Sequence, residues 1–347
     1  GVGTTSLIAE NAQTGTTAND VTNFLDILFA HPNVGPFISK QLIQRLVTSN
    51  PTPEYVDRVA TIFNDNGEGV RGDLLAVAKA ILTDVEATTP SNNTESLAKS
   101  SYGKLREPII RLTHLWRAFN GSTINGDLKD YNIAYSANSY FSQNILQSPT
   151  VFNFFTPDYT RAGTILNAGL VAPEFQITGE QQQVSTENQI MKMIYQWKYT
   201  FVNDSGTTVT IADTSFYVAN QNLTPSNSLN SVVYRVYNNA AHNAIDDPQY
   251  NFYYAYIDIT DWVNNYAIDA TKLVDTLDLV LMSHTMTSDM KILLINYIDS
   301  INESFWSAAD YTKLKNKYSS MPKPYLIVRF LEAASAILLS TQYAIQR

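Results

Sequence analysis

A short apolar block, Ser148–Tyr159, constrains the fold of this chain more than any other feature. Between Pro149 and Pro157 it holds four large apolar side chains: Val151, Phe152, Phe154 and Phe155. Each proline disfavours helix in the residue before it, so the block cannot form a long helix or a membrane span. We therefore expect it to be a wedge between helices, with its phenylalanines packed in the core. It contains no nucleophile, base or metal ligand, so it indicates a scaffold and not a chemistry.

The composition is that of a globular protein with few charges. The chain has 347 residues, which allows one to three domains, and 44% of them are hydrophobic. Only 16% of the residues are charged, against roughly 25% in typical proteins. Neutral polar side chains, including those of 21 tyrosines, take the place of the missing charges. Neutral hydrogen-bonding surfaces of this kind are typical of extracellular proteins and of proteins that bury their exterior in an assembly.

Charge and cysteine content exclude several classes of partner and site. The 23 basic residues are outnumbered by 32 acidic ones, so nucleic acid and anionic membranes are not expected partners. The absence of cysteine excludes disulfides, thiolate metal sites and cysteine nucleophiles. The longest apolar run, Tyr325–Leu339, is interrupted by Arg329 and Glu332, so no membrane insertion is expected. The chain begins at Gly1 without a signal-peptide pattern, and we expect a soluble fragment or processed product.

The hydrophobic periodicity predicts a mainly α fold with a β-rich insertion. Apolar residues recur at helical spacing through most of residues 1–198, the expected helical body. Thr52 with Pro53, and Asp73, are expected to begin two of its helices. From residue 199 to 260 the pattern changes to β-rich segments, with a hairpin expected around residues 203–206. Residues 261–347 are expected to form C-terminal helices that pack back on the body.

Several strings resemble one bacterial family. They are His31-Pro32-Asn33 with Gly35-Pro36-Phe37-Ile38, Leu42–Pro51, Gly69–Leu74, Lys104–Pro108, the Ser148–Tyr159 block, Gly169–Gln176 and Gln342–Arg347. In this order they are similar to the family catalogued as domain of unknown function 1800. The chain resembles the C-terminal part of the usual family member. The resemblance implies a secreted or cell-surface bacterial protein and carries no established activity or catalytic residues.

The histidines and a glycine-rich turn are the candidate metal sites. His31, His114, His242 and His284 lack close ligand spacing, and none is followed by Glu, so structural roles are favoured. The segment Asn64–Gly69 resembles the start of a calcium loop, but its twelfth position is Leu75, where a bidentate Glu is needed. We favour a turn there and expect no cofactor, with calcium as the alternative.

Two charged motifs have simpler structural explanations. Arg71-Gly72-Asp73 matches the integrin-binding tripeptide, but Asp73 is needed as a helix cap. Arg106 and Glu107, with the following helix that carries Arg111 and Arg117, are expected to form an ion-pair network that locks two helices, in preference to a catalytic Arg/Glu pair.

Two pairs of carboxylates are candidates for a glycosidase site. Asp246-Asp247 and Asp258 with Asp261 are the candidate pairs, because glycoside hydrolysis needs two carboxyls about 5–10 Å apart. The Asp247-Pro248 step favours a turn, and Asp261 before Trp262 favours a helix cap. The nucleophile-elbow and phosphate-loop motifs are absent, and we expect no catalytic residues.

A dense aromatic run is the remaining signal. The candidate partner-binding residues are Tyr250, Phe252, Tyr253, Tyr254 and Tyr256. Either some rings face outward, for protein contact or sugar stacking, or the run is a strand buried on both faces.

These observations favour a non-catalytic, secreted or cell-surface protein. We expect it to act through protein–protein contacts as a subunit of an extracellular assembly such as a filament, with itself or another secreted protein as partner. The alternative is a secreted hydrolase or carbohydrate-binding module that acts on a polysaccharide.

Overall fold

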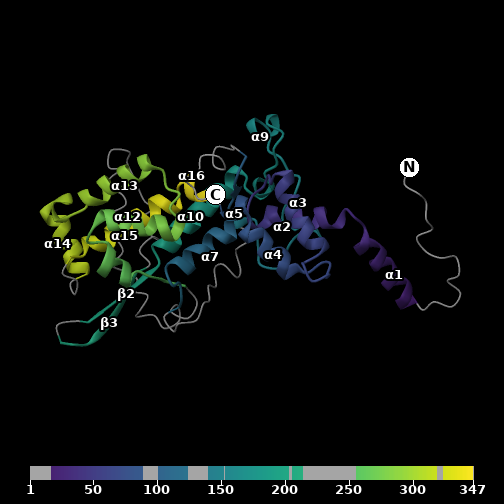
Figure 1. Cartoon of the computed structure of the whole chain (residues 1–347). Helices are drawn as coiled ribbons and strands as arrows, with labels where there is room; N and C mark the ends of the chain where they lie inside the picture. Colours follow the sequence, from purple (N-terminus) through teal and green to yellow (C-terminus); the bar gives the residue numbers. More distant parts are fainter. Residues whose placement is uncertain are drawn as a thin grey trace. The chain divides into compact units, whose positions relative to one another are not determined.

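The computed structural model confirms a mainly helical fold with a few small sheets (Figure 1). It describes residues 17–88, 101–123, 140–151, 153–202, 205–213, 255–318 and 323–346. By its contacts the chain divides into two compact units. The first comprises residues 1–104 with 167–171 and residue 347, and the second comprises residues 105–166 and 172–346. The main boundary thus follows Lys104 and does not coincide with the segments 1–198, 199–260 and 261–347.

The described part of the first unit contains five helices. They are α1 (Thr17–Ala30), α2 (Val34–Leu46), α3 (Pro53–Asn64), α4 (Leu74–Thr83) and α5 (Val85–Thr88). Its core is formed where α2, α3 and α4 meet, around Ile43, Tyr55, Phe63 and Val77. The hydroxyl of Tyr55 is satisfied inside this core because it donates to Ile81 O at 2.6 Å.

Both predicted helix starts in this unit are confirmed. Thr52 Oγ1 accepts from the backbone N–H of Tyr55 at 3.1 Å, with Pro53 in the first turn of α3. Asp73 accepts from the N–H groups of Leu75 and Ala76 and so begins α4. Such side chains satisfy donors that a helix start otherwise leaves unpaired.

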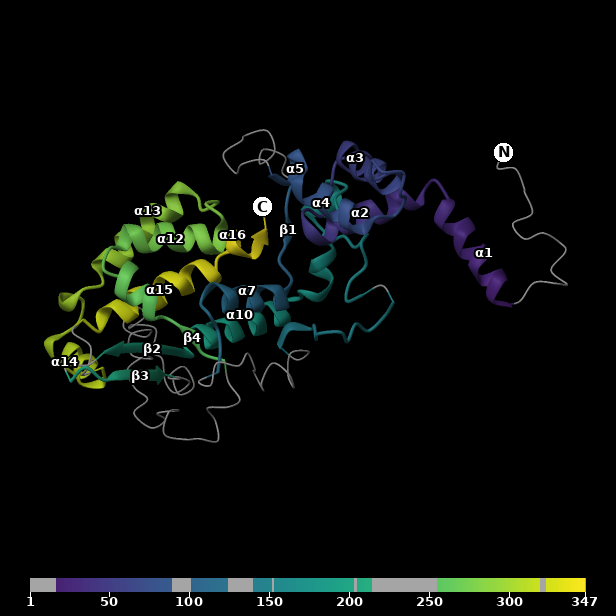
Figure 2. The same ribbon diagram turned by 60° about the horizontal axis from the view of Figure 1, so that its bottom comes forward.

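The second unit packs its helices around α15 (Tyr325–Leu338). The other helices and helical turns described in this unit are α7 (Pro108–Ala118), α9 (Thr164–Asn167, whose last residue belongs to the first unit), α10 (Glu180–Ile194), α12 (Ala270–Met282), α13 (Ser288–Ser300), α14 (Ala308–Lys317), α16 (Thr341–Ala344), the 3-10 turns η1 (Pro173–Ile177) and η5 (Glu303–Phe305), and the π turn η4 (Trp262–Tyr266). Figure 2 shows α12 and α13 on one side of α15 and α7 and α10 on the other. Since α15 is buried on nearly all sides, its apolar run is that of a core helix. Across the described residues, none of the helices is long and apolar enough to cross a bilayer.

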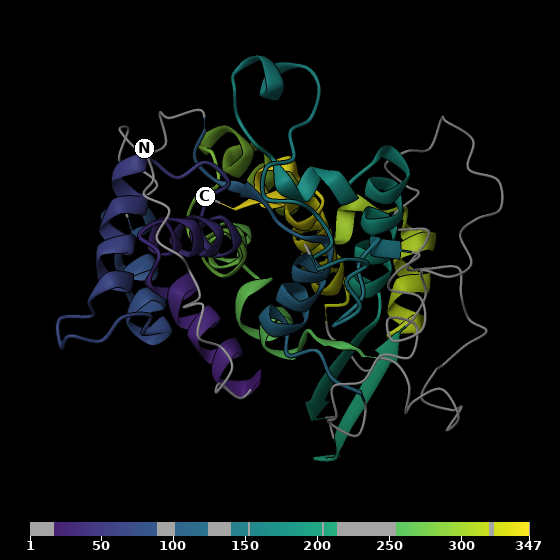
Figure 3. The same ribbon diagram turned by 90° about the vertical axis from the view of Figure 1, so that its right-hand side faces the viewer.

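The predicted hairpin is confirmed. Strands β2 (Trp197–Val202) and β3 (Thr208–Asp213) pair antiparallel, with Tyr199 opposite Ile211, and run side by side in Figure 3. Strand β4 (Ile257–Asp258) adds to β2 in parallel. A separate ladder joins β1 (Lys104–Leu105) to β5 (Ile345–Gln346), and beside it Arg106 N donates to Ala344 O at 2.8 Å.

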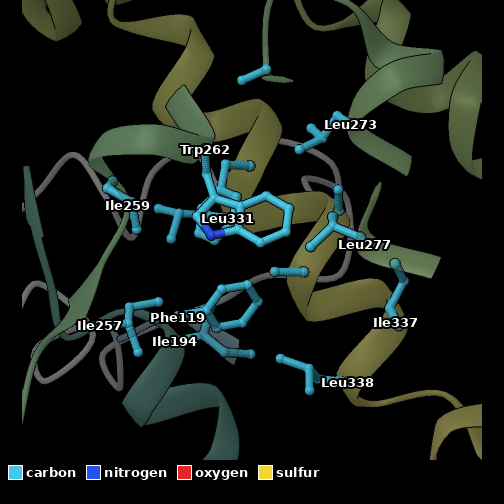
Figure 4. Close-up of a cluster of buried hydrophobic side chains, with 14 of the residues drawn as sticks. Phe119, Ile194, Ile257, Ile259, Trp262, Leu273, Leu277, Leu331, Ile337 and Leu338 are labelled. Carbon is cyan, nitrogen blue, oxygen red and sulfur yellow. The ribbon is translucent and has the colours of Figure 1, made fainter. Parts of the chain in front are cut away.

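Aromatic rings lie at the centre of the second core (Figure 4). Phe119 meets Trp262 edge-on at 5.4 Å and Phe330 edge-on at 5.2 Å between ring centroids. Such edge-to-face pairs are favoured by the ring quadrupoles. The packing fixes the start of the π turn against α7 and α15.

Two features of the second unit differ from the expectation. Helices α10 and α14 lie in segments expected to be helical, but neither was predicted as a separate helix, because their largely polar sequences present few apolar residues at helical spacing. Among the described residues, Arg106 and Glu107 form hydrogen bonds to neutral groups and not the expected ion pairs. Arg106 Nη1 donates to Leu281 O at 3.2 Å, and Glu107 accepts from the Gln143 side chain.

The apolar block is only partly buried, contrary to expectation. Phe155 is 2% exposed, Phe154 is half-buried, and Val151 is 94% exposed. Asn153 has a φ of 73°, and this left-handed turn directs neighbouring side chains to different sides. Phe152 lies outside the described residues. The block therefore anchors the chain through Phe155 and not as a continuous wedge.

Candidate functional site: exposed helix faces and a polar pocket

Helix α1 presents an apolar stripe to solvent. Val21, Phe24, Leu25 and Leu28 recur at the spacing of one helix face, and they are 54%, 51%, 56% and 48% exposed. An amphipathic helix of a globular protein normally buries this face against its own core. Because contiguous exposed apolar surface marks interaction sites, this stripe is a candidate docking face.

The C-terminal end of α1 is anchored within the first unit. The guanidinium of Arg71 donates to Phe29 O at 3.0 Å and to His31 O at 3.1 Å. It also lies 5.5 Å and 5.2 Å from the ring centroids of Phe29 and Phe63. Figures 1 and 2 show α1 projecting from α2, α3 and α4 beyond this anchor. The stripe thus lies on a helix whose last turn is anchored by Arg71.

Helix α4 carries a second exposed apolar face. Val77 and Ile81 point into the core and are fully buried, whereas Leu74, Leu75 and Leu82 are 58%, 81% and 55% exposed. Lys79 is exposed on the same side of the helix. Sequence reasoning missed both faces, because an apolar residue on an amphipathic helix is ordinarily assigned to the core.

The Arg-Gly-Asp tripeptide has structural roles. Arg71 is committed to the end of α1, and Asp73 caps α4 as predicted. Hydrogen bonds from Asn66 and from the backbone of α4 lower the pKa of Asp73. Each end of the motif is therefore engaged within the unit.

The glycine-rich turn uses its oxygens for its own backbone. Asp65 Oδ1 accepts from the N–H groups of Gly67 and Gly69, and Asn66 Oδ1 accepts from those of Glu68 and Val70. These bonds are those of a turn and point no oxygen set at a common centre. Within the described residues, no three His, Asp or Glu side chains gather as a metal site.

The structure describes one of the five residues of the aromatic run, Tyr256. Tyr250, Phe252, Tyr253 and Tyr254 lie outside the described residues, so their partner-binding role stays a prediction. Tyr256 is 0% exposed, and its backbone exchanges hydrogen bonds with Ser122 at 2.9 and 3.0 Å. Its ring belongs to the interior and is not offered to a partner.

The histidines have varied surroundings. His31 Nδ1 accepts from Asn33 N at the start of α2, a structural role as expected. His114 lies between Arg106 and Tyr343, and His284 Nδ1 is 3.8 Å from Asp278. His242 falls outside the described residues.

One candidate carboxylate pair meets in a pocket. Asp258 and Asp261 line a cavity of about 420 Å³ beside the π turn, together with Asn120, Asn264 and Tyr266. Asp261 precedes the turn, but it makes no side-chain cap bond; its Oδ1 accepts instead from Asn265 Nδ2. The other pair, Asp246-Asp247, lies outside the described residues.

Comparison with known proteins identifies a family. No curated relative and no solved structure matches the sequence. The model of one protein family, described as "Protein of unknown function (DUF1800)", matches residues 3–344. Because this match spans nearly the whole chain, the protein belongs to the DUF1800 family.

Proposed function

We propose that this protein is a non-catalytic subunit of an extracellular assembly built from copies of itself. The observation that carries the proposal is the apolar stripe of α1, whose four side chains are each about half exposed. Within the described part of the chain, no other element covers this stripe. A second copy would bury it.

The face of α4 is the complement that a second copy offers. It exposes Leu74, Leu75 and Leu82, so both surfaces are apolar helix faces. Helix α1 carries Asp20 and Asp26 and no basic residue, whereas α4 carries Lys79 and no acidic residue. This opposite charge favours α1 against α4 over α1 against α1, where like charges would meet.

A contact between two different patches has a structural consequence. It is heterologous, so each added copy leaves one α1 face and one α4 face available. Repetition gives a ring if the rotation closes and a filament if it does not. The low charged fraction of 16% and the neutral polar composition support a chain whose exterior is buried in such an assembly outside the cell.

Size-exclusion chromatography with light scattering over a concentration series tests the proposal. The wild-type chain is expected to form species that grow with concentration, and electron microscopy is expected to show rings or filaments. Leu25→Gln in α1 and Leu75→Gln in α4 should each remain monomeric. Asn23→Gln, at an exposed polar position of α1, is the matched control and should assemble like the wild type.

Mixing the two variants distinguishes the contact from a symmetric one. Leu75→Gln retains its α1 face and Leu25→Gln retains its α4 face, so the mixture should give a one-to-one dimer that grows no further. An α1–α1 dimer would instead persist in Leu75→Gln alone and would overturn the heterologous contact. A wild-type chain that stays monomeric at all concentrations would rule out self-assembly. Protease accessibility on intact cells tests the extracellular location.

A further inference from the structure

We propose that the pocket beside the π turn η4 is a binding site for a neutral sugar. It lies entirely within the second unit, at the meeting of the end of α7, strand β4, the π turn and α12. Its volume of about 420 Å³ falls in the range of about 300–1,000 Å³ that small-molecule sites occupy. The site is independent of the α1 and α4 faces, which belong to the first unit.

The π turn supplies several of the polar groups that line the pocket. Ala267 N donates to Trp262 O at 2.8 Å, an i to i+5 bond that widens the turn. Asn264 and Tyr266 from this turn line the cavity, together with Asp261 just before it. Such π turns are rare and occur frequently at functional sites, because the inserted residue costs helix stability.

The polar side chains are held in place by their own partners. Tyr199 OH donates to Asn264 Oδ1 at 2.8 Å, which orients the amide NH₂ of Asn264 as a donor for a ligand. Asp258 Oδ1 accepts from Thr260 N at 3.0 Å. Groups that are already oriented lose little freedom when a ligand binds.

The formal charges that line the pocket are the carboxylates of Asp258 and Asp261. Lys198 Nζ lies 4.0 Å from Asp258 Oδ2, and Lys272 Nζ lies 5.1 Å from the ring centroid of Tyr266. The carboxylates repel an anionic ligand, and the ammonium group of Lys198 weakens the attraction of Asp258 for a cation. A neutral ligand with hydroxyl donors is therefore favoured.

A polyhydroxylated ligand matches the groups that remain. Its hydroxyls can donate to the carboxylates of Asp258 and Asp261 and accept from the amides of Asn120 and Asn264. Charge-assisted bonds to carboxylates are the stronger of these. The ring of Tyr266 provides an apolar surface for the C–H groups of a sugar. The combination of acceptors, donors and an aromatic surface points to a sugar and not to a lipid or a nucleotide.

Isothermal titration calorimetry of the whole chain tests this site. The probes are glucose, galactose, mannose, N-acetylglucosamine, maltose and cellobiose, each at concentrations up to about 10 mM, where affinities in the millimolar range are measurable. At least one should bind. The double variant Asp258→Asn, Asp261→Asn keeps the shape of both side chains and should weaken binding by about 10-fold or more. Asp289→Asn, at an exposed position of α13, should bind as the wild type does.

Three outcomes would overturn the proposal. The first is the absence of binding by any sugar of the panel, and the second is binding that the double variant leaves unchanged while its thermal melting is normal. The third is saturable binding of Ca²⁺ alone, lost in the double variant, which would make the pocket a cation site. Because the pocket lies in the second unit, the double variant should leave the size-exclusion profile unaltered.

Discussion

The imidazole Nδ1 of His114 lies 3.1 Å from the hydroxyl oxygen of Tyr343, although 229 residues separate them in the chain. Their rings are stacked, with centroids 5.8 Å apart and planes inclined by 13°. Arg106 Nη1 is 3.0 Å from the same nitrogen, so Nδ1 accepts from the guanidinium. This cluster ties α16 to α7 within the second unit.

The stability of the second unit should depend on pH through His114. Burial, and then the charge of Arg106, lower the pKa of His114 below its ordinary 6.5. Between the two values the unfolded chain binds more protons than the folded one, so stability falls as pH falls through 6.5 and levels off below the folded value. The change in unfolding free energy with pH should stay below the limit for one whole proton, about 1.4 kcal/mol per pH unit. Because the ring is partly solvated, the folded and unfolded chains differ by less than one bound proton.

Urea unfolding at a series of pH values from 8 to 5 measures this dependence. His114→Gln should remove the part of the slope that His114 contributes, and His31→Gln controls for the loss of an imidazole at an exposed position. A slope unchanged in His114→Gln would contradict the assignment.

Phe155→Ala should destabilise the protein by about 3–5 kcal/mol, because it empties a site that is 2% exposed. Val151→Ala, from the same short block, removes a side chain that is 94% exposed and should change stability by no more than about 0.5 kcal/mol. Thermal melting compares the two. Equal effects would show that the block packs as one piece after all.

Gly72→Ala should loosen the anchor of α1. Gly72 has a φ of 77°, and an added Cβ would lie 2.5 Å from Phe29 Cζ. Gly67→Ala, at a φ of 94° with nothing described within 4 Å, carries the backbone strain alone, about 1 kcal/mol. We expect Gly72→Ala to cost about 1–2 kcal/mol more, with faster hydrogen exchange in α1. If the two variants melt alike, Phe29 is not a structural contact of the turn.

Arg329→Lys should destabilise the second unit by about 2–4 kcal/mol. The buried guanidinium donates to Ile301 O and Asp299 O near the end of α13 and to Ile268 O after the π turn, at 2.7–3.1 Å. A single ammonium cannot reach all these carbonyls. Arg117→Lys, at an exposed position of α7, is the control and should melt as the wild type does. If Arg329→Lys leaves the stability unchanged, water must replace the lost hydrogen bonds.

Local elements were predictable where a local cause determines them. Thr52 and Asp73 begin helices because their side chains reach donors two or three residues away, and the β2–β3 hairpin follows from residues on either side of one turn. The polar helices α10 and α14 could not be predicted in this way. They bury a few residues, such as Ile190 and Leu314, against partners distant in the chain.

The amino-acid sequence by itself determined the family, the mainly helical class and the helix starts, because each depends on strings or spacings a few residues long. Only the tertiary structure decided which apolar residues are buried. Phe155 is in the interior while Val151 and Leu75 are exposed, and burial depends on which neighbours pack against a face. It also brought Asp258 and Asp261 into a pocket with Asn120, since a pocket is formed by elements that meet in space.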